Sequence, residues 1–130
     1  MAKLNINLND RSYPIYITTD FNTLGKSIQS AGVNGKIVVV TDSNVDKLYA
    51  GICIDVLTAY GFDVYKYVIE AGEKSKNLDT VRDIYKFLIE VKLDRSSALL
   101  ALGGGVVGDI TGFAAATFLR GISFIQVPTS

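Results

Sequence analysis

The sequence of 130 residues contains no histidine and no tryptophan, and only one cysteine. Histidine is the commonest general base, and histidine and cysteine are the usual ligands of zinc in proteins. We therefore expect no catalytic residue and no metal ligand within this chain. A single cysteine cannot form an internal disulfide, and the chain opens without a charged-then-apolar signal segment. Both observations favour a reducing, cytoplasmic location.

Cys53, the single cysteine, lies in the apolar run "LYAGICIDVL". A free cysteine in such a run behaves as a small core side chain. No histidine is present to activate the thiol. We expect a buried structural thiol.

Neither an excess of one charge nor a long apolar run is present. The 13 basic residues balance the 13 acidic residues, which argues against a nucleic-acid or membrane-surface partner. The chain contains no run of about 18 apolar residues, the length needed to span a membrane. With 48% hydrophobic residues, the chain is expected to form one compact domain over residues 1–130.

The apolar pattern predicts strands that alternate with helices. The first eighteen residues alternate around Asn9 to Ser12, which indicates a β-hairpin, and Asp20 and Gly32 bound a short helix. Buried strands follow at 36–42, 62–70, 96–104 and 123–128. This order predicts an α/β fold, a Rossmann-like doubly wound and mainly parallel sheet with an N-terminal β-hairpin.

Three helices are expected between the buried strands. The first ends at Gly61, and its apolar residues recur at helical spacing: Val45, Leu48, Tyr49, Ile52, Val56 and Tyr60. The second has the apolar stripe Leu78, Val81, Ile84, Tyr85 and Leu88. The third spans 106–119, and its small residues permit close packing on the sheet: Gly112, Ala114, Ala115 and Ala116.

Four segments follow the carboxyl ends of the expected parallel strands, where ligands of such sheets bind. They are Asp42, the loop Glu73 to Lys76, the glycines 103–105, and Thr129 with Ser130. We expect these four loops to converge on one crevice.

Gly103, Gly105 and Gly108 satisfy a G-x-G-x-x-G spacing between a strand and a helix. Backbone without side chains lets N–H groups approach a diphosphate, and the helix N-terminus faces its charge. The spacing therefore predicts dinucleotide binding, and a purely structural tight turn is the alternative. The acid expected about 20 residues later is missing, because Pro128 stands there. Asp42 is the other source of that carboxylate, and it also suits a helix N-cap; the two roles can coexist.

Each of the other charged residues near these loops has two possible interpretations. The run "GEKSK" (72–76) is either solvated surface or a ligand contact. Asp109, expected in the first turn of a helix, either bonds a ribose or nicotinamide group or complements the helix dipole. Arg120, expected near the end of that helix, either complements the dipole or binds a phosphate with its guanidinium.

Taken together, three blocks resemble the 3-dehydroquinate synthase family of sugar-phosphate cyclases: "VVVTDSNV", "GEKSK" and "GGGVVGDITGFAAATFLRGISFIQVPTS". The resemblance covers essentially the whole chain, but only the N-terminal, NAD-binding half of such enzymes. It implies that the metal ligands, a Glu and two His, belong to a helical C-terminal domain absent here. It also implies a divalent metal, zinc or cobalt, in the full-length enzyme only.

The resemblance implies NAD contacts for fifteen residues. Asp42 and Asn44 would contact the adenosine side, Glu73 and Lys76 the ribose or phosphate region, and Asp109 and Thr129 the nicotinamide end. Ser130 stands where the family often has a second Thr. The implied cofactor-binding set is Asp42, Asn44, Gly72, Glu73, Lys74, Ser75, Lys76, Gly104, Gly105, Val106, Val107, Gly108, Asp109, Thr129 and Ser130.

The implied reaction converts 3-deoxy-D-arabino-heptulosonate 7-phosphate to 3-dehydroquinate and phosphate, a lyase step of the shikimate pathway in aromatic amino-acid biosynthesis. Arg120 resembles an arginine that reaches the substrate phosphate across a homodimer interface. We expect no turnover from this chain alone. Alternatives are another sugar-phosphate cyclase, an iron-type NAD-dependent polyol dehydrogenase, or a non-catalytic nucleotide-binding module. Gly112 stands where the dehydrogenases have a lysine.

Overall fold

The computed structural model describes residues 2–6, 13–17, 24–30, 32–33 and 35–129. Within them, six strands form one sheet in the order β1-β2-β6-β5-β3-β4. Only β1 and β2 pair antiparallel, and every other neighbouring pair is parallel. The strands are β1 (Ala2–Ile6), β2 (Tyr13–Ile17), β3 (Lys36–Asp42), β4 (Asp63–Ile69), β5 (Ala98–Gly103) and β6 (Ser123–Pro128).

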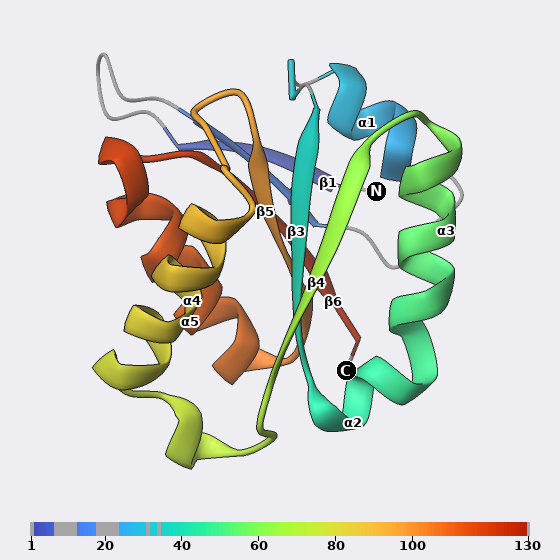
Figure 1. Cartoon of the computed structure of the whole chain (residues 1–130). Coiled ribbons are helices and arrows are strands. Elements are labelled where there is room, and N and C mark those ends of the chain that lie inside the picture. The colour runs from blue at the N-terminus through green and yellow to red at the C-terminus, as the bar shows by residue number, and fades with distance from the viewer. Residues whose placement is uncertain (1, 7–12, 18–23, 31, 34, 130) are drawn as a thin grey trace.

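Helices cover both faces of this sheet (Figure 1). On one face lie α1 (Leu24–Ser30) and α3 (Gly51–Ala59), and on the other lie α4 (Leu78–Glu90) and α5 (Gly105–Thr117). Shorter helical turns are α2 (Ser43–Val45), the π-helical η3 (Asp46–Ala50), and the 3₁₀ turns η4 (Glu73–Ser75) and η5 (Phe118–Arg120). The predicted fold class and hairpin are confirmed. The expected hairpin turn at Asn9 to Ser12 and the helix start at Asp20 lie outside the described residues.

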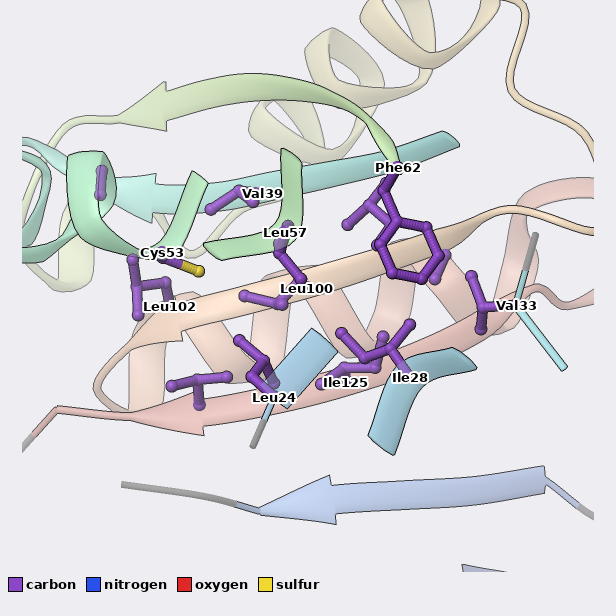
Figure 2. Packing of buried hydrophobic residues seen from close by; sticks show 14 residues of the cluster. Leu24, Ile28, Val33, Val39, Cys53, Leu57, Phe62, Leu100, Leu102 and Ile125 are labelled. Atoms are coloured by element: carbon purple, nitrogen blue, oxygen red, sulfur yellow. The ribbon is translucent and has the colours of Figure 1, made fainter. Parts of the chain in front are cut away.

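The strand β3 is apolar from Ile37 to Val40, because these residues are buried on both faces of the sheet. Its alternate residues Ile37 and Val39 belong to the cluster under α1 and α3, while Val38 and Val40 belong to the cluster under α4 and α5. Figure 2 shows the first cluster, with Leu24 of α1 beside the residues of β5 and β6. A central parallel strand therefore produces a continuous β-branched run rather than an alternating pattern.

The helical segment after β3 differs from the stripe expected over 45–60. Its buried residues are Ala50, Cys53 and Leu57, whereas Leu48 and Ile52 are 66% and 55% exposed. The π-helical turn η3 explains the difference, because its wider turns bring positions five apart, such as 45 and 50, onto one face. The segment is helical as predicted, but its core face was assigned wrongly.

Cys53 is fully buried in that segment, as expected for a structural thiol. Burial raises the pKa of the Cys53 thiol from 9.0 to about 12, so that the thiol stays protonated at neutral pH.

Close packing of α5 on the sheet depends on its glycines. A Cβ at Gly108 would lie 2.7 Å from Nε2 of Gln126, and one at Gly112 would lie 3.3 Å from Cε2 of Phe124. Ala114 and Ala115 are buried as expected, but Ala116 is exposed. These contacts place α5 directly over β5 and β6, which positions its N-terminus at the carboxyl ends of the strands.

Candidate functional site

The four predicted loops follow the carboxyl ends of their strands, which lie near the label α2 in Figure 1. This end of the sheet is called the carboxyl edge, and the opposite end of the strands the amino edge. The strands that they follow are neighbours in the order β6-β5-β3-β4. After β3 the chain crosses to the face of α3, and after β5 it crosses to the face of α5. The carboxyl ends of β3 and β5 therefore flank a topological switch point, where doubly wound sheets bind their ligands.

The glycine turn gives α5 an N-terminus without side-chain cover. Gly103 has a φ of 154°, and Gly104 is the N-cap and makes no side-chain cap. The helix begins at Gly105, where an added Cβ would meet no atom within 4 Å. The first amides of a helix have no partner within it, so that the N–H groups of 105–107 are available to an anion. Val107 and Gly108 are themselves buried and offer only backbone.

Asp42 caps the helical segment after β3. Its Oδ1 accepts hydrogen bonds from the backbone N of Asn44 at 2.9 Å and of Val45 at 2.8 Å. The expected N-cap role is therefore confirmed. Both bonds use the same oxygen, so that Oδ2 remains for the ribose hydroxyl contact that the sequence suggested. Asn44 is exposed beside it.

The loop after β4 contains five predicted contact residues that differ in orientation. Gly72 has a φ of 114°, and Glu73 and Lys74 are exposed. Lys74 Nζ lies 2.6 Å from Oε1 of Glu70. Ser75 is buried, and its hydroxyl donates to the carbonyl of Glu70 at 2.6 Å. The hydroxyl of Ser75 therefore holds the loop in shape.

An ion pair joins this loop to α5. Lys76 Nζ lies 2.9 Å from Oδ2 of Asp109, and both side chains are at least half exposed. The hydrogen bond to Asp109, with its charge and that of Glu73, raises the pKa of Lys76, so that the ammonium stays charged at neutral pH. The placement of Asp109 in the first turn was wrong, because that turn of α5 contains no acidic residue. Two predicted contact residues thus form an ion pair between the loop after β4 and α5.

Arg120 lies at the amino edge of the sheet, at the opposite ends of the strands from the glycine turn. It belongs to η5, beyond the end of α5, and precedes β6, whose first residue Ser123 pairs with Ala98 at the amino end of β5. β5 spans about 17 Å between its ends, so that Arg120 does not reach the carboxyl edge of its own sheet. Its φ of 65° and that of Leu119, 50°, are left-handed.

Thr129 follows β6 at the carboxyl edge, as expected, and Ser130 lies outside the described residues. Three further polar residues lie at this edge, and the sequence patterns did not predict them. Thr41 is buried and donates to the carbonyl of Leu102 at 2.8 Å, which ties β3 to β5. Ser43 contacts the loop after β4, and Asn77 caps α4 by accepting from the N of Thr80 at 2.9 Å. Of these, only Asn77 had a sequence signal, as a cap residue before an apolar run.

Among the described residues, no group of three or more Cys, Asp or Glu side chains is placed to hold a metal ion. In the same part of the chain, every helix is too short or too polar to cross a membrane.

The sequence and the fold are similar to those of known proteins. The family model described as "3-dehydroquinate synthase N-terminal" matches residues 66–130. A curated 3-dehydroquinate synthase of Acetivibrio thermocellus is 65% identical over 130 residues, which are 100% of this chain and 36% of that protein. The chain thus spans about a third of the length of the curated relatives that it matches.

Two solved structures resemble this chain in fold. A 2-deoxy-scyllo-inosose synthase complexed with carbaglucose-6-phosphate, NAD+ and Co2+ has a TM-score of 0.79 and 25% identity, over 98% of this chain and 35% of that chain. A glycerol dehydrogenase of Schizosaccharomyces pombe has a TM-score of 0.68 and 20% identity, over 88% of this chain and 27% of that chain. The second likeness concerns the fold alone.

Proposed function

Because this chain belongs to the 3-dehydroquinate synthase N-terminal family, we propose that it binds NAD at the carboxyl edge of its sheet, as the cofactor-binding part of a 3-dehydroquinate synthase. The observation that carries the proposal is the open N-terminus of α5, where Gly104 and Gly105 leave helix amides uncovered. Such amides suit the diphosphate of a dinucleotide.

The described side chains fit the two ends of the cofactor. On the β3 side, the free oxygen of Asp42 and the exposed Asn44 suit the adenosine ribose. On the β5 side, Asp109 and Thr129 suit the nicotinamide end. Lys76 and Glu73 follow β4, the strand beyond β3, and the ion pair of Lys76 with Asp109 holds the ammonium of Lys76 against α5.

The reaction proposed for the full enzyme is the conversion of 3-deoxy-D-arabino-heptulosonate 7-phosphate to 3-dehydroquinate and phosphate. Bound NAD would supply a transient hydride acceptor for it. This chain contributes binding and orientation of the cofactor. A divalent metal would be held by residues outside this chain, which contains no histidine. Arg120 would bind the sugar phosphate in the active site of a partner subunit of a homodimer.

Calorimetric titration of the 130-residue chain with NAD tests the proposal. We expect saturable binding with one NAD per chain, and a Gly105→Trp variant, whose side chain would fill the open space before α5, to abolish it. A chain that gives no binding heat and no shift of its melting temperature with NAD would overturn the proposal.

A second measurement separates binding from catalysis. With NAD, zinc and 3-deoxy-D-arabino-heptulosonate 7-phosphate, we expect no release of phosphate by this chain alone. Sustained release would contradict the assignment of the metal ligands to residues outside it.

The iron-type dehydrogenase remains the second candidate function, supported by the likeness of fold to glycerol dehydrogenase. Gly112 argues against it, because this position packs against Phe124 and has no side chain that could contact a ligand. Reduction of NAD by the chain with glycerol and an added divalent metal would favour the dehydrogenase instead.

A further inference from the structure

Ser43 connects two of the loops at the carboxyl edge of the sheet. Its Oγ accepts a hydrogen bond from the backbone N of Ala71 at 3.2 Å, between residues 28 positions apart in the chain. Both residues are partly shielded from solvent. Ser43 itself lies between Asp42 and Asn44, the two residues proposed for the adenosine side.

The bond extends the ladder between β3 and β4 beyond the last strand pair. That pair is Asp42 with Ile69, after which β3 turns into α2. A helical backbone cannot supply the next carbonyl to a neighbouring strand, because its carbonyls point along the helix axis. The side-chain oxygen of Ser43 supplies the acceptor instead, and it satisfies an N–H that would otherwise lose its partner.

This bond holds the start of the loop after β4 against Ser43, while the ion pair of Lys76 with Asp109 holds its end against α5. Gly72 follows with a φ of 114°, and an added Cβ there would meet no atom within 4 Å. Its carbonyl accepts from the backbone N of Ser75 at 3.2 Å, a contact within the loop. Further along, the hydroxyl of Ser75 bonds the carbonyl of Glu70, and Nδ2 of Asn77 donates to the carbonyl of Lys74 at 2.7 Å. These bonds hold the shape of the loop, whereas the bond to Ser43 fixes the loop against β3.

We propose that Ser43 is a positioning residue for dinucleotide binding, which holds Glu73 and Lys76 at a fixed distance from Asp42 and Asn44. The inference rests on the proposed binding of NAD. Ser43 acts through Ala71 and needs no contact with the cofactor.

The test compares variants of the 130-residue chain by calorimetry with NAD. Loss of one shielded hydrogen bond weakens binding by about three- to tenfold, so we expect the dissociation constant of Ser43→Ala to rise by that factor. Ser43→Thr keeps the hydroxyl and should restore the wild-type value. Should Ser43→Ala not fold, Ser43→Cys, with a similar shape and a poor acceptor, takes its place with the same expected loss.

Thr117→Val is the matched control. The hydroxyl of Thr117 bonds Tyr85 and joins α5 to α4 near the amino ends of the strands. This variant should leave the dissociation constant for NAD unchanged. Amide exchange of Ala71, followed by NMR, should accelerate in Ser43→Ala and not in Thr117→Val.

Three outcomes would overturn the inference. If the wild-type chain does not bind NAD, the proposed function is wrong, and so is the inference that rests on it. Wild-type binding with an unchanged dissociation constant in Ser43→Ala, even at a lower melting temperature, leaves the proposed function intact and reduces Ser43 to a structural residue. Equal weakening by Ser43→Ala and Ser43→Thr would show that the hydrogen bond is not the cause.

Discussion

The glycines of the turn after β5 have different physical constraints, although they are adjacent in the sequence. Gly103 has a φ of 154°, and a Cβ there would lie 3.1 Å from Cγ2 of Val107. Gly105 has helical backbone and open space around it. The fold therefore requires glycine at position 103 but not at position 105.

Alanine substitutions separate these two requirements. Gly103→Ala should lower the free energy of unfolding by about 1–3 kcal/mol, because its backbone region is nearly restricted to glycine. Gly105→Ala should raise it by about 0.5 kcal/mol, since alanine loses less entropy in a helix. It should also weaken NAD binding by about tenfold or more, because its methyl group crowds the diphosphate. Urea unfolding and calorimetry measure both quantities. Undiminished NAD affinity in Gly105→Ala would contradict the cradle.

Cys53 gives a prediction for alkaline pH. Its pKa is raised from 9.0 to about 12 in the folded chain, so that above pH 9 the unfolded thiol loses its proton while the native thiol keeps it. The contribution of the buried, protonated thiol to the free energy of unfolding is complete below pH 9 and is lost as the pH rises towards 12. Between pH 8 and 10, the free-energy difference between wild type and Cys53→Ala should fall by about 1 kcal/mol. If urea unfolding gives the same free-energy difference between wild type and Cys53→Ala at pH 8 and at pH 10, the pKa of the Cys53 thiol is not raised.

Asp42 caps the short helical turn α2 and is proposed to bind a ribose hydroxyl, and a pair of variants separates these two roles. Asp42→Asn keeps the side-chain oxygen that accepts from Asn44 and Val45, and removes the charge. Asp42→Ala removes both and should lower the free energy of unfolding by about 1 kcal/mol, whereas Asp42→Asn should change it little. Both variants should weaken NAD binding if the second oxygen contacts a ribose hydroxyl. Wild-type affinity in Asp42→Asn would leave Asp42 as a cap only.

Sequence patterns predicted those elements whose form follows from local chemistry. The strand Lys36–Asp42 was recognisable because burial on both faces requires an unbroken apolar run, and α4 because its stripe matches the 3.6-residue period. The core face of the segment after β3 was not recognisable, since a π-helical turn changes the period from within. No propensity distinguishes five residues of π-helix from α-helix.

The same limit applies to the contacts between loops. The convergence of Asp42, the loop after β4 and the glycine turn follows from strand order, which the alternation of strands and helices indicated. The ion pair of Lys76 with Asp109 and the bond of Ser43 to Ala71 join positions 33 and 28 residues apart by numbering. Such pairs depend on side-chain directions at the loop ends, and no periodicity encodes them.

In the proposed enzyme, NAD binds at the carboxyl edge of the sheet and Arg120, at the amino edge, takes no part in binding it. Substitution of Arg120 tests this proposal. The place of Arg120 at the amino edge, about 17 Å of strand away from the glycine turn, separates it from the proposed NAD site of its own chain. Arg120→Ala should therefore leave the dissociation constant for NAD unchanged in the 130-residue chain. Lys76→Gln, at the carboxyl edge, should raise it, while its melting temperature stays close to wild type because the pair with Asp109 is exposed. Weaker NAD binding in Arg120→Ala, measured by calorimetry, would mean that the amino edge takes part in holding the cofactor of its own chain.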